Sequence, residues 1–505
     1  MVMLEGKKIL LIEPPFYRLY KDTYSLNMLP LSLGYLGASI KKNSDWDVLL
    51  YNADFSAKIE SMRLTYLAGE GFVNYKNNLN SIDRKIWQEI RDVIARYKPF
   101  VVGISAKTQN FKSACIVAKI VKDISDKIIV VMGGPHPSMV GTEVMKCSEV
   151  DICVFGEGEV TIVELLSAFE GKSKIENISG IIYRENDSVV RSQNREMIKD
   201  LDVLDFPFKY ASEILYDFSN YPKNAFAHIF ATRGCPYNCA FCGSKYIWTR
   251  RVRFRSPENV VQELRILQQE GINFVRFEDD TFGINNKYLK ELCDAIRQNC
   301  PGLAWSCEIP VQLVDEKNIS LMKRAGCYQI SIGVESGSDE ILSVINKNIT
   351  IEKAFQACSL IKKHRITLSV FFMVGFPQET EKSLADTITA IKKIKCDSVT
   401  YSIFTPYPGT ETYALCKNLG LISGDHDYSM FNHQSPENNF CVNISHERFR
   451  EIVSKLEGFI EKRNSAKLFK YIFSPYFFIR MRQLGFKKSI KIALHRLSWI
   501  IENDK

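Results

Sequence analysis

Short apolar runs alternate with longer segments of helical spacing in two stretches of the chain. In the first stretch we expect strands at residues 7–15, 46–54, 99–106, 127–134 and 150–159. Helices are expected between them at residues 30–42, 81–97 and 110–124. Strands buried on both faces read as nearly continuous apolar runs, so this stretch predicts a parallel α/β sheet with helices on both sides.

The same alternation restarts at residue 228. Six strands are expected at residues 228–233, 272–278, 303–308, 328–335, 367–375 and 397–404. Helices are expected near residues 257–270, 286–299, 315–325, 351–364 and 379–394. Six β/α units fit a partial barrel better than a complete eightfold one. The loops that follow the strands should then carry the chemistry.

Charge is distributed unevenly along the 505 residues, although the net charge is +8. Between Lys462 and Ile501 there are ten Lys and Arg residues and no Asp or Glu. Removing those ten from the 66 basic residues leaves 56 against 58 acidic ones, which is close to balance. The basic excess therefore belongs to the tail, and we expect no nucleic-acid partner.

The chain begins "MVMLEGKKILLIEPPF", with too short an apolar run for a signal peptide or a spanning helix. We therefore expect a cytoplasmic protein. Fourteen cysteines in that compartment argue against a disulfide framework. Most of them are isolated in the sequence, and a lone cysteine is usually a small buried apolar residue.

Three cysteines do cluster, in "TRGCPYNCAFCGSKY" at residues 232–246. Cys235, Cys239 and Cys242 follow the first expected strand of the second stretch, with Gly, Pro and Asn among them. Zinc sites usually complete four ligands, but the next cysteine is Cys293. Three thiolates can instead hold three irons of a [4Fe–4S] cluster and leave the fourth iron open. A thiol cluster or an incomplete zinc site is the alternative.

The motif "CPYNCAFC" resembles the signature of radical S-adenosylmethionine (SAM) enzymes, a resemblance that covers roughly residues 228–410. The family has a partial β/α barrel, in agreement with the strand count. The resemblance implies that SAM chelates the open iron and that one electron from the cluster cleaves it to a 5′-deoxyadenosyl radical. Phe241, before the third cysteine, is at the position that packs beside the adenine in the family.

Further matches at strand ends imply SAM-binding residues. "FEDDTF" at residues 277–282 offers Glu278, Asp279 and Asp280 for the methionyl amine, with a solvated acidic turn as the alternative. "SIGVESGSD" at residues 331–339 places Glu335 and Ser336 near the ribose or carboxylate, with a helix N-cap as the alternative. Glu308, after the third strand, is a further candidate. "MVGFPQET" at residues 373–380 resembles the motif that borders the adenine.

The first stretch resembles the N-terminal cobalamin-binding domain that some radical SAM proteins carry. "PLSLGYLGASI", "VVGISA", "VVMGGPHPSMV" and "VFGEGE" occur in the order seen in those proteins. The resemblance implies cobalamin held over the C-terminal edge of the sheet by the backbone around six positions: Ser105, Gly133, Gly134, Gly156, Glu157 and Gly158. Glycines there would allow close approach of the ligand.

One departure concerns the lower axial ligand of cobalt. Many cobalamin proteins use a histidine in D-x-H-x-x-G after the first strand, but here that position reads "EPPFYRLY". We therefore expect no histidine from that motif on the cobalt. His136, in "GGPHP", is either a substitute contact with cobalamin or an ordinary hydrogen-bonded loop residue. Loss of cobalamin binding by the domain is a third reading.

These resemblances predict an α/β architecture in four parts. They are a Rossmann-like cobalamin domain at residues 1–179, a linker at 180–227 that includes a short hairpin, a partial (β/α)6 TIM-type radical SAM barrel at 228–435, and a helical C-terminal extension at 436–505.

The implied reaction is methylation of an unactivated carbon through a 5′-deoxyadenosyl radical and methylcobalamin, with a [4Fe–4S] cluster, SAM and cobalamin as cofactors. Oxidative ring closure or rearrangement without methyl transfer is the alternative reaction. A cluster-bearing cobalamin sensor is the alternative outside enzymes. No hydrogen donor or acceptor can be named from the sequence, so the catalytic residues stay unknown. The implied partners are a small-molecule or lipid substrate and a one-electron reductant such as flavodoxin or ferredoxin.

The tail carries eight aromatic residues between residues 462 and 501 in addition to its ten basic ones. In "GFKKSIKIALHRLSWII" one helical face holds the apolar residues Phe486, Ile490, Ala493, Leu497 and Ile500, and another holds Lys488, Lys491 and His495. This pattern fits an interfacial helix on an anionic membrane. The alternative is a C-terminal helix that packs on the barrel and leaves its basic face in solvent.

Overall fold

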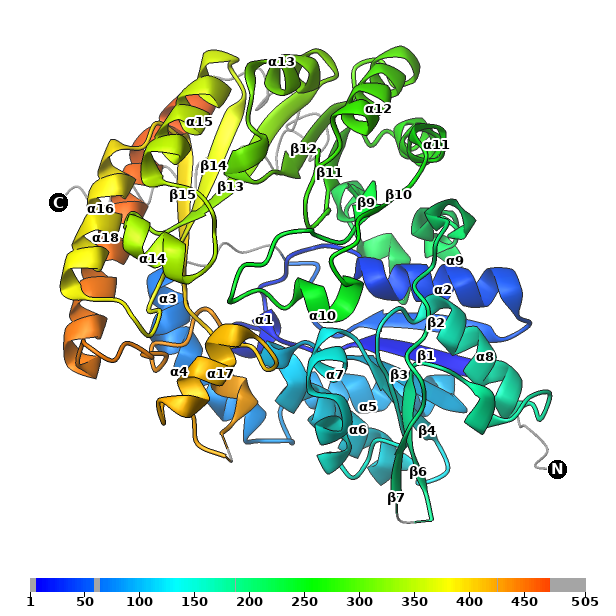
Figure 1. The fold of residues 1–505 in the computed structure, drawn as a ribbon. Helices are drawn as coiled ribbons and strands as arrows, with labels where there is room; N and C mark the ends of the chain where they lie inside the picture. The colour runs from blue at the N-terminus through cyan, green and yellow to red at the C-terminus, as the bar shows by residue number, and fades with distance from the viewer. Residues whose placement is uncertain (1–5, 59–63, 187, 425, 473–505) are drawn as a thin grey trace. The chain divides into compact units, whose positions relative to one another are not determined.

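Two large β-sheets organise the computed structural model, which describes residues 6–58, 64–186, 188–424 and 426–472. The sheets belong to two compact units (Figure 1). The first unit comprises the described residues of Met1–Tyr221, Phe241–Arg253 and Thr405–Glu437. The second comprises those of Pro222–Ala240, Phe254–Phe404 and Asn438–Lys505.

The sheet of the first unit has seven strands in the order β2-β1-β3-β4-β5-β6-β7. The strands are β1 (Lys8–Glu13), β2 (Asp47–Asn52), β3 (Val101–Ser105), β4 (Ile129–Gly133), β5 (Ile152–Val154), β6 (Ile181–Glu185) and β7 (Ser188–Arg191). The first five strands pair in parallel, whereas β6 and β7 pair antiparallel. The hairpin that we assigned to a linker therefore extends this sheet.

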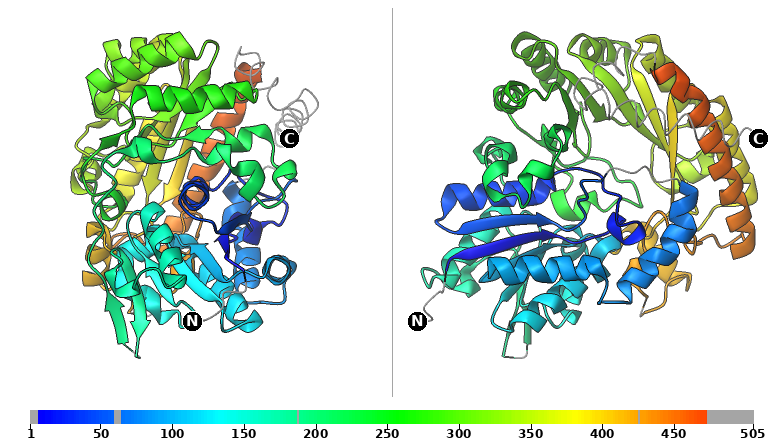
Figure 2. Two further views of the ribbon diagram at one scale, coloured as in Figure 1. Left: turned by 90° about the vertical axis from the view of Figure 1, so that its right-hand side faces the viewer. Right: turned by 180° about the vertical axis from the view of Figure 1, so that it is seen from behind.

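Helices cover both faces of the first sheet, as the apolar runs of its strands require. They are α1 (Tyr17–Tyr20), α2 (Leu31–Asn43), α3 (Leu64–Ala68), α4 (Glu70–Leu79), α5 (Lys85–Tyr97), α6 (Phe111–Ile124), α7 (Pro135–Val140) and α8 (Glu159–Phe169). Helix α2 contacts α8, and α5 contacts α6 on the opposite face (Figure 2). Helix α4 lies between the expected strand at residues 46–54 and the expected helix at residues 81–97, where we predicted no element. Its Phe72, Tyr75 and Leu79 are buried, and they recur at helical spacing.

The strand order places a topological switch between β1 and β3, because the chain continues to β2 on one side of β1 and to β3 on the other. Open α/β sheets of this order bind ligands in the crevice at the carboxyl ends of the strands that flank the switch. Here those ends are Glu13 and Ser105. The switch therefore locates the ligand crevice that the glycine-rich loops predict.

The sheet of the second unit has six parallel strands in the order β15-β14-β13-β12-β11-β8. They are β8 (His228–Ile229), β11 (Phe274–Phe277), β12 (Ala304–Glu308), β13 (Cys327–Glu335), β14 (Thr367–Val374) and β15 (Ser398–Ile403). The helices between them are α11 (Pro257–Gln269), α12 (Asn286–Asn299), α13 (Glu316–Arg324), α14 (Asp339–Val344), α15 (Ile351–Lys363) and α16 (Glu381–Lys393). The predicted partial (β/α)6 barrel is confirmed.

The strands of this barrel alternate between fully buried and partly exposed residues. In β14, Leu368 and Val370 are buried, whereas Thr367 and Ser369, which alternate with them, are half-buried. The interior of a complete (β/α)8 barrel is instead a packed apolar core. One face of this sheet is therefore accessible and partly polar.

The C-terminal part of the chain divides between the two units. Helix α18 (His446–Ile472) belongs to the second unit and runs along β15, where Asn464 Oδ1 accepts a hydrogen bond of 3.0 Å from the Val399 amide (Figure 2). Residues 405–437 instead pack on the first unit, where Tyr75 donates a hydrogen bond of 2.9 Å to the Ser429 carbonyl. Across the described residues, no helix combines the length and apolar character needed to cross a membrane. The basic face predicted around Lys488 lies outside those residues.

Candidate functional site

The cysteine loop follows β9 (Thr232–Arg233), directly after the first strand of the barrel. Cys235 and Cys239 belong to the second unit, and Cys242 belongs to the segment 241–253 that packs with the first. None of the three is in a disulfide and all are half-buried, and Phe241 is half-buried as well. Within the described ranges, no three His, Cys, Asp or Glu side chains are grouped as metal ligands. Three available thiols in one short loop are nevertheless a donor set that fits iron.

Two residues at the end of β11 hold the start of this loop. One carboxylate oxygen of the buried Asp279 accepts hydrogen bonds from the Ala231 amide at 2.9 Å and from the amide and hydroxyl of Thr232. Burial raises the pKa of Asp279 to about 7, against the lowering effect of these hydrogen bonds. The hydroxyl oxygen of Thr281 lies 2.9 Å from Cys235 Sγ. The sequence marked Asp279 as a SAM contact, and nothing in the motif pointed to Thr281.

A charged network occupies the accessible face of the barrel next to the loop. Arg276 pairs with Glu278 at 2.9 Å and with Glu308 at 2.5 Å, and His228 bonds to Glu278 at 2.7 Å. Burial opposes ionisation of Glu278, but His228 and Arg276 outweigh it and hold its pKa below the ordinary value. Burial raises the pKa of Glu308, together with the charges of Glu278 and Glu335, and Arg276 only partly offsets this.

Glu278 and Glu308, two of the expected SAM contacts, thus both form ion pairs with Arg276. Sequence reasoning missed Arg276 and His228. In their strands, polar residues that are half-buried alternate with buried apolar ones. This alternation could have indicated that His228 and Arg276 face the accessible side of the sheet.

The end of β13 is an unusual backbone site. Glu335 has a φ of +69°, in the left-handed region that non-glycine residues rarely adopt, and the ladder with β14 shifts register there. Its carboxylate pairs with Lys347 at 2.7 Å. Such backbone strain clusters at functional sites. Ser336 is fully buried, its hydroxyl contacts that of Thr387 and it accepts a hydrogen bond from the Ser338 amide. It is not the N-cap of α14, because that helix begins at Asp339 and its N-cap is Ser338.

The remaining matches at strand ends differ in exposure. Asp280 is exposed. In "MVGFPQET", the fully buried Glu379 accepts hydrogen bonds from the amides of Gly375 and Phe376 and so closes the turn after β14. Burial raises the pKa of Glu379 to about 7. The Glu379 side chain therefore holds the backbone of this turn in place.

In the first unit, the loops after β3, β4 and β5 meet at the crevice edge. The Ala106 amide donates to the Gly133 carbonyl at 2.7 Å, and a Cβ atom on Gly134 would lie 2.8 Å from the Ala106 carbonyl oxygen. Gly156 has a φ of +77°, and a Cβ atom added to it would meet no atom within 4 Å. Ser105 is buried beside these loops. The open backbone at Gly156 fits the close approach of a large flat ligand.

An ion pair that the sequence did not reveal lies at the switch itself. Lys107, two residues after β3, contacts Glu13 at the end of β1 with 2.8 Å between nitrogen and oxygen. The Glu13 side chain is 10% exposed and that of Lys107 is 47% exposed. The pair joins the two strands that bound the crevice.

The Glu157 side chain is directed to an arginine and not to open space. Arg253 Nη1 contacts both carboxylate oxygens of Glu157, at 2.8 and 2.9 Å, and the Ile198 amide donates to the same carboxylate at 2.7 Å. The side chain of Glu157 is 1% exposed and that of Arg253 is 11% exposed. This buried pair anchors the end of segment 241–253 beside the glycines at 156 and 158.

His136 is fully buried in α7. Its Nδ1 lies 3.0 Å from the Thr108 hydroxyl, and its ring packs against Phe111 and Tyr428. Burial, aided by His426, lowers its pKa to about 3, so the ring is neutral. The ring is thus packed, with one nitrogen beside a hydroxyl and Nε2 buried without a hydrogen-bond partner among the described residues.

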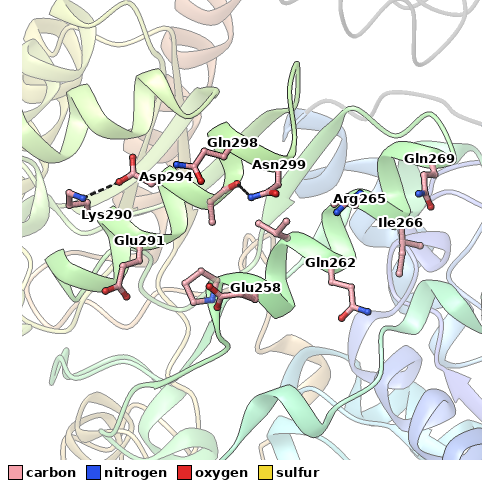
Figure 3. Close-up of a pocket in the computed structure, with 13 residues that line it drawn as sticks. Glu258, Gln262, Arg265, Ile266, Gln269, Lys290, Glu291, Asp294, Gln298 and Asn299 are labelled. Atoms are coloured by element: carbon pink, nitrogen blue, oxygen red, sulfur yellow. Dashed lines mark hydrogen bonds and ion pairs between the residues drawn. The ribbon is translucent and has the colours of Figure 1, made fainter.

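A surface groove of about 710 Å³ lies between α11 and α12 on the outside of the barrel (Figure 3). Long polar side chains line it, among them Lys290 and Asp294, which pair at 3.0 Å. None of its lining residues is a candidate site residue. The groove therefore reflects the spacing of two covering helices.

Comparison with known proteins relates both units to described families. Residues 229–391 match the radical SAM superfamily, and residues 17–166 match the B12 binding domain. The chain is 33% identical over 420 residues to an uncharacterised methyltransferase of Pyrococcus horikoshii, which covers 82% of this chain and 84% of the relative. The chain belongs to the B12-binding radical SAM enzymes.

Two further comparisons span much of this B12-binding radical SAM enzyme. The anaerobic magnesium-protoporphyrin IX monomethyl ester cyclase of Rubrivivax gelatinosus is 29% identical over 356 residues, 69% of this chain and 63% of the cyclase. The structure of the radical SAM methyltransferase TsrM from Kitasatospora setae, with cobalamin and a [4Fe–4S] cluster bound, aligns with a TM-score of 0.68. That alignment covers 97% of this chain and all of TsrM at 15% identity, so it supports the fold alone.

The two family matches confirm the expected cofactors, which are a [4Fe–4S] cluster, SAM and cobalamin. They also confirm that the protein is an enzyme, and a small-molecule substrate is consistent with the radical SAM family. The expected fold, a Rossmann-like domain followed by a partial barrel and a helical C-terminal region, is confirmed as well.

Proposed function

We propose that the protein is a cobalamin-dependent radical SAM methyltransferase that methylates an unactivated carbon. The observation that carries this proposal is the presence of both cofactor domains in one chain that is similar over 82% of its length to a methyltransferase. When bound, the cluster and SAM supply a radical that removes a substrate hydrogen, and cobalamin supplies the methyl group. The protein's own residues must hold these groups and keep water from the radical.

Cys235, Cys239 and Cys242 would hold the cluster through three thiolates. Their half-buried thiols, none of them in a disulfide, support this assignment, because a reactive cluster needs both protein ligands and one accessible iron. Phe241, between the last two of them, would pack against the adenine of SAM. The Asp279 carboxylate would act indirectly, by fixing the backbone of residues 231–232 that leads into the loop.

Cobalamin would lie over the carboxyl ends of β1, β3, β4 and β5. The backbone at Ser105, Gly133–Gly134 and Gly156–Gly158 would line its binding site. The open space beside Gly156 supports this assignment. Glu157 would contribute through its backbone, since its side chain is engaged by Arg253. His136 would contribute no ligand to cobalt, because its ring is enclosed by Phe111 and Tyr428.

The acids on the barrel face would bind the methionyl amine of SAM. Glu278 and Glu308 place two carboxyl groups beside one arginine, and carboxylate oxygens are the acceptors that an ammonium ion prefers. Glu335, whose carboxylate faces Lys347, would complete the SAM site near the ribose or carboxylate. The buried Ser336 would support the turn after β13. The exposed Asp280 would flank the SAM site.

Replacing Glu308 with glutamine tests this assignment. Loss of one carboxylate is expected to weaken SAM binding about tenfold, since a hydrogen bond to a charged group contributes about 1.5–3 kcal/mol and Glu308 is partly screened by solvent. Anaerobic equilibrium dialysis of the reconstituted enzyme with labelled SAM measures the change. Glu316→Gln, an exposed acid of the same unit, is the matched control. Equal affinity of wild type and Glu308→Gln would contradict the assignment.

Isotope-labelled SAM distinguishes methyl transfer from the alternative reaction. Anaerobic incubation of the reduced enzyme with methyl-labelled SAM and a cell extract is expected to place the label in a product. An oxidative ring closure, the reaction type of the cyclase relatives, would form deoxyadenosine without a labelled product. That outcome would overturn methyl transfer, and mass spectrometry of the extract would reveal the ring-closed compound.

The identity of the partners is a proposal as well. A flavodoxin or ferredoxin would supply the electron to the cluster. A lipid substrate and contact with a membrane surface remain predictions based on the basic, aromatic tail, most of which lies outside the described residues.

A further inference from the structure

The hydroxyl of Thr281 is directed at a proposed cluster ligand. Its oxygen lies 2.9 Å from Cys235 Sγ, within the second unit. Thr281 is 1% exposed, so its hydroxyl is shielded from solvent. Neither the family motifs nor the comparisons assign a role to this residue.

Thr281 is held in position from both sides. On one side, Asp279 is tied to the backbone amides of residues 231 and 232, at the base of the cysteine loop. On the other side, the Phe282 amide donates to the Glu308 carbonyl at 3.2 Å, and the Phe282 ring packs against Phe277 and Trp305. Because both neighbours are anchored, the hydroxyl stays next to the sulfur without a large cost in side-chain entropy.

The direction of the hydrogen bond follows from the chemistry of the sulfur. A free Cys235 thiol carries a proton and can donate it to the Thr281 oxygen, while Thr281 donates to the Asp280 carbonyl at 2.8 Å. A cluster-bound thiolate has no proton, so the only proton available between the two atoms is that of the hydroxyl. Hydrogen bonds to ionised acceptors are about twice as strong as neutral ones, which favours donation to the sulfur over donation to the carbonyl.

We propose that Thr281 is a positioning residue that donates a hydrogen bond to the Cys235 thiolate and raises the reduction potential of the [4Fe–4S] cluster. A donor at a ligand sulfur stabilises the reduced cluster more than the oxidised one, because the reduced form carries one more negative charge. The cluster then accepts its electron from a weaker reductant than it would otherwise need. The proposal rests on ligation of the cluster by Cys235 and is independent of methyl transfer.

A pair of substitutions separates the hydroxyl from the shape of the side chain. Thr281→Val keeps the shape and removes the donor, whereas Thr281→Ser keeps the donor and removes a methyl group. Redox titration of the reconstituted full-length protein, followed by electron paramagnetic resonance of the reduced cluster, measures the midpoint potential. The valine variant is expected to be about tenfold harder to reduce, a shift of about 59 mV to more negative potential for a one-electron couple. The serine variant is expected to match the wild type.

Two results would overturn the proposal. One is an unchanged midpoint potential in Thr281→Val, and the other is an equal shift in Thr281→Ser, which would assign the effect to packing. If the valine variant fails to retain iron, electron–nuclear double resonance of the wild type in H₂O and D₂O provides an independent test. The reduced cluster is expected to couple to an exchangeable proton, and absence of that coupling would overturn the proposal without any variant. Iron loss in Cys235→Ser tests ligation separately, so failure of the two assignments can be distinguished.

Discussion

Replacing Cys235 with serine is expected to abolish both the bound cluster and reductive cleavage of SAM. A serine hydroxyl is a poor substitute for a soft thiolate, and the loop has only three cysteines with which to hold three irons. The same result is expected for Cys239→Ser and Cys242→Ser, because each removes one of the three attachment points. Iron content after anaerobic reconstitution, and deoxyadenosine formed on reduction with dithionite, measure the two losses.

Cys147→Ser is the matched control for this loss. Cys147 is half-buried, as the loop cysteines are, but it lies far from them in the sequence and contacts Glu149 at 3.6 Å. Its variant is expected to retain the cluster and to form deoxyadenosine as the wild type does. Full iron content and normal deoxyadenosine formation in Cys235→Ser would contradict the three-cysteine assignment. They would also exclude any role for Thr281 that acts through this sulfur.

The fold could be predicted because the strands of both sheets carry strong local signals. Leu10 and Ile12 in β1, and Val130 and Met132 in β4, are fully or almost fully buried and stand in short apolar runs between amphipathic helices. A run buried on both faces marks a parallel strand wherever it occurs. The cysteine motif could also be recognised from the sequence, since its three cysteines lie within eight consecutive residues.

Contacts between residues far apart in the sequence carry no such signal. Thr281 meets Cys235 across 46 residues, and Arg253 meets Glu157 across 96. Each residue type is unremarkable in its local context, and only the fold brings the partners together. Residues 405–437 pack with the first unit although they directly follow the last barrel strand, for the same reason. Burial is likewise invisible in a motif, as at His136, whose ring is enclosed by Phe111 and Tyr428.

Replacing Arg253 with methionine is expected to destabilise the crevice edge of the first unit by about 3–5 kcal/mol. The substitution keeps much of the side-chain volume but removes the arginine nitrogen that contacts both oxygens of the buried Glu157 carboxylate. An uncompensated buried charge is far more costly than a missing surface pair. Hydrogen exchange of the amides in α8, which begins two residues after Glu157, measures the local free energy of opening. Cobalamin binding is expected to weaken in parallel, because the same turn carries Gly156 and Gly158.

The double variant Glu157→Gln/Arg253→Met tests whether the charge itself is responsible. Removing both charges takes away the uncompensated carboxylate, so the double variant is expected to be more stable than Arg253→Met alone. Arg448→Ala removes two exposed ion pairs, with Glu381 and Glu451, and is expected to leave the stability of α18 nearly unchanged. Unchanged exchange in α8 of Arg253→Met would contradict the prediction. A double variant as unstable as Arg253→Met would show that the arginine acts through packing and its bond to the Ile198 carbonyl, and not by neutralising Glu157.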